Sequence, residues 1–277
     1  MSVAYIPVQW TRSKWVYDAV LVVAVVAYVA GFLLIGAPAA AQTRPVDGAI
    51  LNARALGTCA FFMLSLILAI GPLARLDRRF LPLLYNRRHF GVLTAFVALG
   101  HASFVLDWYF AFSPTPALEA LFSANTATDR LVGFPFEWLG AFALVALAIL
   151  AATSHDFWLS FLTPPVWKAL HLLLYPAYAA VTGHIALGAL QAQDNAAFAV
   201  IAVLTAVGVA GLHLATWRIP ATAAPAEWLA VDDADAIPEG RARIVSLPDG
   251  RRAAVFRQEG RLAALSNACA HQNGPLG

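Results

Sequence analysis

The sequence predicts an all-α membrane protein, a bundle of six transmembrane helices followed by a small, incomplete all-β domain. Three observations predict this class. Hydrophobic residues make up 60% of the 277 residues and charged residues only 12%, whereas a soluble domain carries about 25% charged residues. Six apolar stretches are each long enough to cross a hydrocarbon core of about 30 Å. After Pro220 the pattern changes to short apolar segments separated by turn residues.

The six expected spans make up a domain from residue 15 to residue 218, after a cytoplasmic segment of residues 1–14. In chain order they cover residues 15–40, 55–73, 90–112, 134–153, 166–190 and 196–217. Lipid offers no hydrogen-bond partners to backbone groups, so we expect each stretch to be a helix. The first stretch lacks a convincing small-residue cleavage pattern, and we interpret it as a retained helix.

Arginines predict the orientation of these spans. The segment "ARLDRRFLPLLYNRRHF", between the second and third spans, carries five arginines, whereas residues 113–133 carry only Arg130. Arginine-rich loops favour the cytoplasmic side. We therefore expect a multi-pass protein of the bacterial inner membrane, surrounded by lipid and with both termini cytoplasmic, although Arg44 and Arg54 count slightly against this. The net charge of +2 gives no reason to expect a nucleic-acid partner.

The C-terminal part predicts a short antiparallel sheet. Residues 219–226 form an expected linker, and residues 227–277 form the second domain. Its strands are expected at "ARIVSL", "RAAVFR" and "LAALSN", with turns at "IPEG", "LPDG" and "RQEGR". Because roughly 50 residues bury only a marginal core, we expect this domain to be incomplete.

Histidines are the main candidates for chemistry in the bundle. Ionisable side chains are costly inside a membrane, so each is a functional candidate, although a hydrogen bond between helices is the alternative. Four of the seven lie in or at the ends of two spans: His89, His101, His171 and His184. Spacings of 12 and 13 residues separate the two of each helix by about 18 and 20 Å. Since the third and fifth spans run in the same direction, equal depth pairs His89 with His171 and His101 with His184.

Facing imidazoles are suited to axial ligation of haem iron without an open coordination site. The predicted function is therefore electron conduction across the membrane through one or two haems. Neither spacing places both histidines on one helix face, so the helices must tilt or the two haems must lie at different azimuths. His89 lies among arginines, where a surface position is the alternative. Asp107 and Glu137, near the outer ends of their helices, are explained by exposure at the interface.

Three segments carry a family resemblance: "LGTCAFFMLSLILAIGPLARL", "NRRHFGVLTAFVALGHASFVLDWY" and "WKALHLLLYPAYAAVTGHIAL". They resemble the ferric-reductase-like transmembrane domain, in particular the haem-binding membrane subunit of bacterial methionine sulfoxide reductase. The most specific piece is W-K-x-L-H followed by a tyrosine and a second histidine. The likeness covers about residues 50 to 218 and implies b-type haem held by helical histidines, with electrons entering from the cytoplasm. A residue other than histidine is expected at position 89 in the bacterial subunit, so the two-haem arrangement of NADPH oxidases is the alternative.

The tail "GRRAAVFRQEGRLAALSNACAHQNGPLG" resembles the start of a Rieske ferredoxin-type domain. The resemblance implies that Cys269 and His271 are the first ligand pair of a 2Fe-2S cluster, whose second pair would lie in a later C-x2-H motif. No such motif follows, and we expect the chain to end inside this domain. An unrelated surface cysteine and histidine are the alternative.

Together these features predict an oxidoreductase component in which a cytoplasmic Rieske centre passes single electrons through haem to a periplasmic or quinone acceptor. The sequence has no flavin or nicotinamide motif, which implies an external donor on the cytoplasmic side. Two alternatives remain: an accessory subunit of a larger respiratory or reductase complex, and a reductase that acts on quinone, ferric ions or oxygen in its own pocket.

Overall fold

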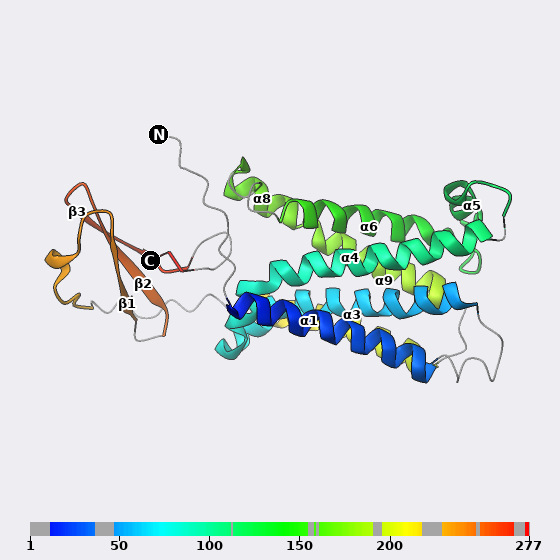
Figure 1. Cartoon of the computed structure of the whole chain (residues 1–277), viewed down its shortest axis with the longest axis horizontal. Coiled ribbons are helices and arrows are strands. Elements are labelled where there is room, and N and C mark those ends of the chain that lie inside the picture. The colour runs from blue at the N-terminus through cyan, green and yellow to red at the C-terminus, as the bar shows by residue number, and fades with distance from the viewer. Residues whose placement is uncertain are drawn as a thin grey trace.

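The computed structural model describes residues 12–36, 47–111, 113–154, 158, 161–190, 196–217, 229–247, 250–268 and 275–276. Its α-helices are α1 (Arg12–Gly31), α3 (Gly48–Leu76), α4 (Leu81–Ala111), α5 (Ala117–Ser123), α6 (Glu137–Ala152), α8 (Pro164–His171), α9 (Leu174–His184) and α10 (Ala196–Trp217). Short π-helices, η1 (Phe32–Gly36) and η3 (Ile185–Ala189), extend α1 and α9. Figure 1 shows the long helices side by side along one axis. We call the end at which α3, α6 and α10 begin the far end.

The protein is a multi-pass membrane protein. Within the described ranges, five helical segments are long and apolar enough to cross a membrane: Lys14–Ile35, Gly48–Leu76, Asn86–Tyr109, Pro165–Ala189 and Ala196–Trp217. The predicted fourth span is the apolar helix α6, which has only 16 residues. At 1.5 Å per residue it is about 24 Å long, shorter than the hydrocarbon core. Length and composition therefore support five spans, and the sixth stays a prediction.

Helices α3 and α4 extend well beyond the apolar stretches that predicted them, with 29 and 31 residues. Hydropathy reports only the part of a helix that lies in lipid, whereas backbone hydrogen bonding continues until a cap ends it. Asp47 is the N-cap of α3, and its side chain accepts a hydrogen bond from the Ala49 amide at 2.7 Å. The helix continues through Pro72 to Leu76.

The predicted fifth span is interrupted between its two histidines. Helix α8 ends at His171 and α9 begins at Leu174, with a turn at Leu172 and Leu173. Pro176 lies in the first turn of α9, where its missing amide hydrogen does least harm, so the interruption falls just before it. The rise calculated for one continuous helix therefore only approximates the separation of His171 from His184.

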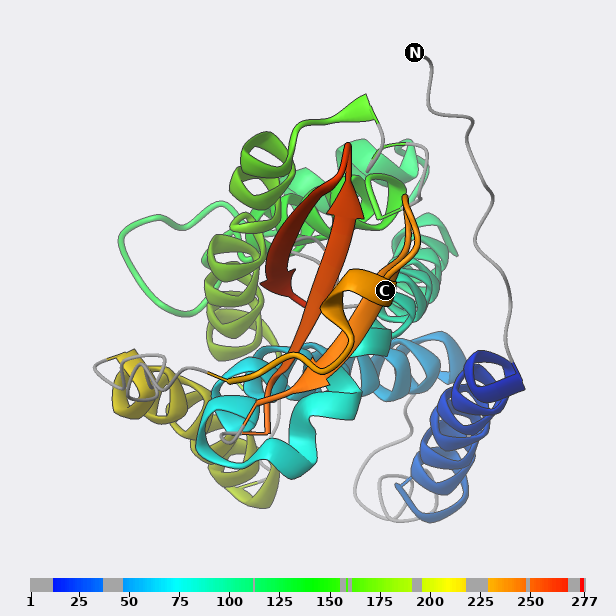
Figure 2. The ribbon, with the colours of Figure 1, turned by 90° about the vertical axis from the view of Figure 1, so that its left-hand side faces the viewer.

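Helix α3 is the centre of the bundle. It packs against α1, α4, α9 and α10, and it supplies many of the buried residues, including Phe61 and Leu64 at 2% exposure. Viewed along the bundle, α1 and α10 lie at different edges (Figure 2). Helix α6 packs on α4 and α9, so two antiparallel helix pairs, α3 with α4 and α6 with α9, meet along one seam.

The C-terminal part forms the predicted three-stranded antiparallel sheet. Its strands are β1 (Ala242–Ser246), β2 (Arg252–Gln258) and β3 (Arg261–Ser266), in the order β1-β2-β3. Glu259 and Gly260 join β2 to β3 with φ angles of 52° and 72°. A two-residue loop with both φ angles positive is the type I′ turn that matches the twist of a hairpin. The sheet is confirmed, and its identity as part of a Rieske domain stays a prediction.

Candidate functional site

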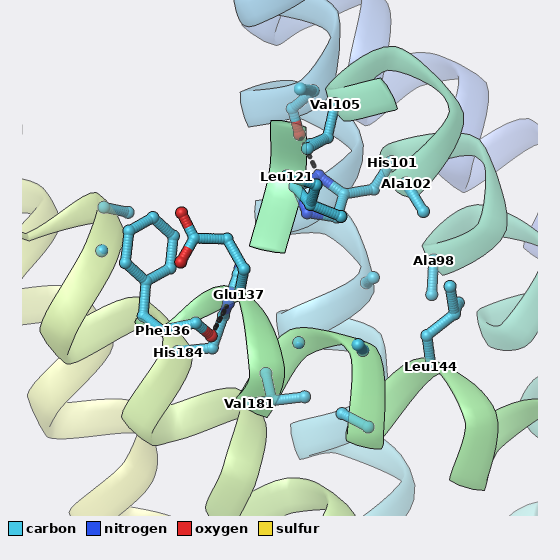
Figure 3. Close-up of a pocket in the computed structure, with 18 of the residues that line it drawn as sticks. Ala98, His101, Ala102, Val105, Leu121, Phe136, Glu137, Leu144, Val181 and His184 are labelled. Carbon is cyan, nitrogen blue, oxygen red and sulfur yellow. Dashed lines mark hydrogen bonds between the residues drawn. The ribbon is translucent and has the colours of Figure 1, made fainter. Parts of the chain in front are cut away.

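Two of the four predicted histidines face each other across the seam. His101 lies on α4 and His184 is the last residue of α9. Their ring centres are 6.2 Å apart and the ring planes make an angle of 82°. Both rings line one cavity of about 670 Å³ toward the far end (Figure 3).

Each of these rings is fixed by a backbone carbonyl from the other member of its own helix pair. The Nδ1 atom of His101 lies 2.8 Å from the Ala53 carbonyl oxygen, and Nδ1 of His184 lies 3.0 Å from the Phe136 carbonyl oxygen. A carbonyl oxygen only accepts, so Nδ1 carries the proton and donates it in both rings. The Nε2 atoms are left with their lone pairs, which is the state in which imidazole binds a metal.

Two glycines provide the space for the rings. A Cβ atom at Gly57 would lie 2.9 Å from Nδ1 of His101, and one at Gly140 would lie 2.8 Å from Cε1 of His184. Real Cβ atoms essentially never approach other atoms that closely. Each histidine ring therefore lies close against a helix that has no side chain at that point.

The two halves of the site are repeats of one pattern. In both halves the carbonyl residue precedes its histidine by 48 positions, and the glycine precedes it by 44 (57 to 101 and 140 to 184). The dipeptides Leu56-Gly57 and Gly100-His101 recur 83 residues later as Leu139-Gly140 and Gly183-His184. In each half the leucine packs on the glycine before the histidine, where an added Cβ atom would meet its side chain at 3.3 and 3.1 Å. The helix pairs α3–α4 and α6–α9 are thus equivalent units around the seam.

The histidine pair fits an iron between two axial ligands. A metal–imidazole bond is about 2 Å long and the ring centre lies about 1 Å beyond the nitrogen, so two such ligands place their ring centres about 6 Å apart. The observed separation is 6.2 Å. The donor set, two neutral imidazoles with fixed tautomers, is one that haem iron accepts in electron-transfer proteins. The residues present therefore fit haem b.

The cavity is mostly apolar, and the described residues that line it include two charged side chains, Arg54 and Glu137. Glu137 is only 6% exposed. Its Oε1 atom accepts hydrogen bonds from the Tyr109 hydroxyl, at 3.1 Å, and from the Asn125 amide. The interpretation of Glu137 as an exposed interface residue was therefore wrong, whereas Asp107 is exposed as expected. The error arose because a position near a helix end does not reveal that the loop before α6 folds back over it.

His89 and His171 have different partners from the first pair. The Nδ1 atom of His89 lies 2.8 Å from a carboxylate oxygen of Asp18 on α1. Nδ1 of His171 lies 3.0 Å from the carbonyl oxygen of Trp167, whose ring stacks on it at 3.8 Å. Neither histidine lines the cavity of about 670 Å³. Ligation by this second pair stays a prediction.

Cys269 and His271 lie outside the described residues, so the structure does not place the predicted cluster ligands. Within the residues that it does place, no group of three or more His, Cys, Asp or Glu side chains is arranged to hold a metal ion.

The part of the chain that holds most of this site is similar to a known protein family. Residues 56–182 match the family of ferric reductase-like transmembrane components. The matched segment contains Gly57, His101 and Gly140, and it ends two residues before His184. It indicates a transmembrane electron-transfer function. No curated protein matches the chain.

Proposed function

We propose that the protein is a b-type cytochrome that carries electrons across the membrane, with haem held between His101 and His184. The observation that carries this proposal is the pair of facing imidazoles whose Nδ1 protons are both donated to carbonyl oxygens. Haem bound there supplies one-electron chemistry. Ligation from both sides leaves no open position for a substrate, which favours electron transfer over catalysis at the iron.

The chain's own residues would position and shield such a group. The carbonyl oxygens of Ala53 and Phe136 fix the tautomers of the two histidines, and Gly57 and Gly140 let the rings lie close to α3 and α6. Apolar side chains such as Leu64, Leu144 and Leu147 line the cavity and would surround the group with apolar surface. The Arg54 guanidinium at its wall is suited to a carboxylate such as a haem propionate.

A second haem between His89 and His171 would complete a path from one membrane face to the other. The bond between His89 and Asp18 supports this, because metal-bound histidines commonly donate their other ring proton to a carboxylate. The presence of histidine at position 89 favours the two-haem arrangement.

Electrons would enter from the cytoplasmic side of a bacterial inner membrane. The C-x-H spacing of Cys269 and His271, after three antiparallel strands, supports a Rieske-type 2Fe-2S centre as the entry point. An external donor would reduce this centre, and a periplasmic protein or a quinone would accept the electrons. The bacterial methionine sulfoxide reductase system is the proposed parallel, in which the chain serves as the membrane subunit of a larger complex.

Electron transfer into sealed liposomes tests this function. Protein reconstituted into liposomes that enclose ferricyanide should reduce it when dithionite is added outside, faster than protein-free liposomes do. His184→Ala should lower the rate to that of protein-free liposomes because one axial ligand is lost. The matched control is His213→Ala on α10, whose Nδ1 bonds the Val209 carbonyl of its own helix. Equal rates for wild type and His184→Ala would refute the proposal.

A further inference from the structure

The two equivalent halves of the site differ in the size of the residues at two corresponding positions. Ala53 provides the carbonyl oxygen for His101, whereas its counterpart 83 residues later is the large Phe136. Four residues after His101 stands Val105, whereas four residues after His184 stands Gly188. All four side chains or backbones line the cavity. In the first half the two side chains are the small one of Ala53 and the medium-sized one of Val105. In the second half they are the large ring of Phe136 and the single hydrogen of Gly188.

Phe136 contacts His184 in two ways. Its carbonyl oxygen accepts the Nδ1 proton, and its ring centre lies 5.2 Å from the centre of the imidazole at an angle of 56° between the planes. Figure 3 shows the Phe136 ring beside His184 at the wall of the cavity. A ring at this position restricts rotation of the imidazole about the bond to its own helix. Ala53 offers His101 the carbonyl oxygen and no ring.

Gly188 makes room for the Phe136 ring. A Cβ atom at Gly188 would lie 2.5 Å from two carbons of that ring. Gly188 is buried and lies in η3, the π-helical turn that directly follows His184. Such wide turns are frequent at functional sites. In the second half, therefore, glycine in place of valine removes side-chain volume where phenylalanine in place of alanine adds it.

We propose that Phe136 is a positioning residue that sets the ring plane of His184 relative to His101, and that Gly188 is the residue that admits it. The proposal rests on the proposed function, because it gives His184 the role of an axial ligand. The angle of 82° between the two imidazoles is the quantity that Phe136 would control. That angle affects the low-spin ferric EPR signal and the midpoint potential of a haem with two histidine ligands, so both report on it.

The coupling between Phe136 and Gly188 can be tested by substitutions that give the second half the residue sizes of the first half. The variants are Phe136→Ala, Gly188→Val and the double variant, in full-length protein in detergent, with haem per chain, ferric EPR spectrum and midpoint potential as readouts. Phe136→Ala should keep haem but shift the EPR spectrum and the potential. Gly188→Val should lose the haem held by His101 and His184, because the valine side chain collides with the Phe136 ring. The double variant should recover the haem that Gly188→Val loses, with the EPR spectrum of Phe136→Ala.

Two controls separate positioning from general damage. Gly208→Val places the same change on α10, where a Cβ atom meets nothing within 4 Å, and should leave haem content unchanged. Phe136→Tyr keeps the ring and should keep the wild-type EPR spectrum. The inference alone is overturned if wild type holds haem but the double variant holds no more than Gly188→Val, or if Phe136→Ala leaves spectrum and potential unchanged. Wild-type protein without haem would instead refute the proposed function.

Discussion

At the scale of the residue, the site depends on positions that carry no side chain. Gly57 and Gly140 lie on α3 and α6, where the imidazoles of His101 and His184 would meet any Cβ atom at 2.9 and 2.8 Å. Glycine in a helix interior is unfavourable by about 0.5–1 kcal/mol relative to alanine. Both glycines therefore lower the local preference for helix, and the close approach of the rings explains why glycine stands there.

Alanine at either glycine should displace the adjacent imidazole. We expect Gly57→Ala and Gly140→Ala each to lower haem content. Overpacking should destabilise each variant by about 1–3 kcal/mol, which offsets the gain in helix preference. Gly91→Ala on α4 is the control, because a Cβ atom there meets nothing within 4 Å. Haem per chain and the thermal unfolding midpoint in detergent measure the effect. Haem contents equal to that of Gly91→Ala would show that the rings do not need this space.

Sequence alone predicted the histidines but not the residues that hold them. A histidine in an apolar span is conspicuous because charged and polar groups are rare there. Glycine, alanine and phenylalanine are ordinary in such spans, so Gly57, Gly140 and Phe136 gave no signal of their own. The repeated dipeptides at an offset of 83 residues were a usable signal, because they place a glycine and a histidine at the same spacing in both halves.

At the scale of the element, α5 and the loop after it close the far end of the cavity. Leu118, Leu121 and Phe122 of α5 line the cavity, and the Phe122 ring stacks on Trp138 of α6 with 4.2 Å between the ring centres. Glu137 joins this segment to the bundle, since it accepts from Asn125 after α5 and from Tyr109 on α4. One buried carboxylate therefore connects three parts of the chain.

Removing the Glu137 carboxylate should weaken the attachment of α5 and the loop after it to the bundle. We expect Glu137→Ala to destabilise the protein by about 1–3 kcal/mol, because the Tyr109 hydroxyl and the Asn125 amide lose their acceptor. Hydrogen exchange of residues 117–125 should become faster than in wild type. Glu137→Gln keeps an acceptor oxygen, so its exchange rate should lie between those of wild type and Glu137→Ala. Glu119→Ala, on the exposed face of α5, is the control, and identical exchange in Glu119→Ala and Glu137→Ala would contradict the role of Glu137.

Apolar stretches predicted the long helices because hydropathy measures the property that places a helix in lipid. They could not predict the ends of α3 and α4, where caps such as Asp47 decide the boundary. They also missed the interruption between α8 and α9, since the residues around Pro176 are as apolar as the rest. The three strands were predictable from turn residues, and the type I′ turn at Glu259 and Gly260 explains why.

At the scale of the whole molecule, two equivalent helix pairs surround one seam, and α1 and α10 flank them. The seam places His101 and His184 together because α4 and α9 run in the same direction and occupy equivalent positions. Composition and span count indicate a membrane protein but not which helices meet. Matching depth along two parallel spans was enough to predict this pair. The same reasoning pairs His89 with His171, and that pair stays a prediction.

The most direct test of the central claim is the haem content of the purified protein in detergent, measured by pyridine haemochrome and by the reduced-minus-oxidised spectrum. We expect a low-spin b-type spectrum. His101→Ala and His184→Ala should each remove the haem that this pair holds, whereas His213→Ala should remove none. One haem per chain would assign it to the pair His101 and His184, and two would add His89 and His171. Wild-type protein without haem, or His184→Ala with the wild-type spectrum, would contradict the account.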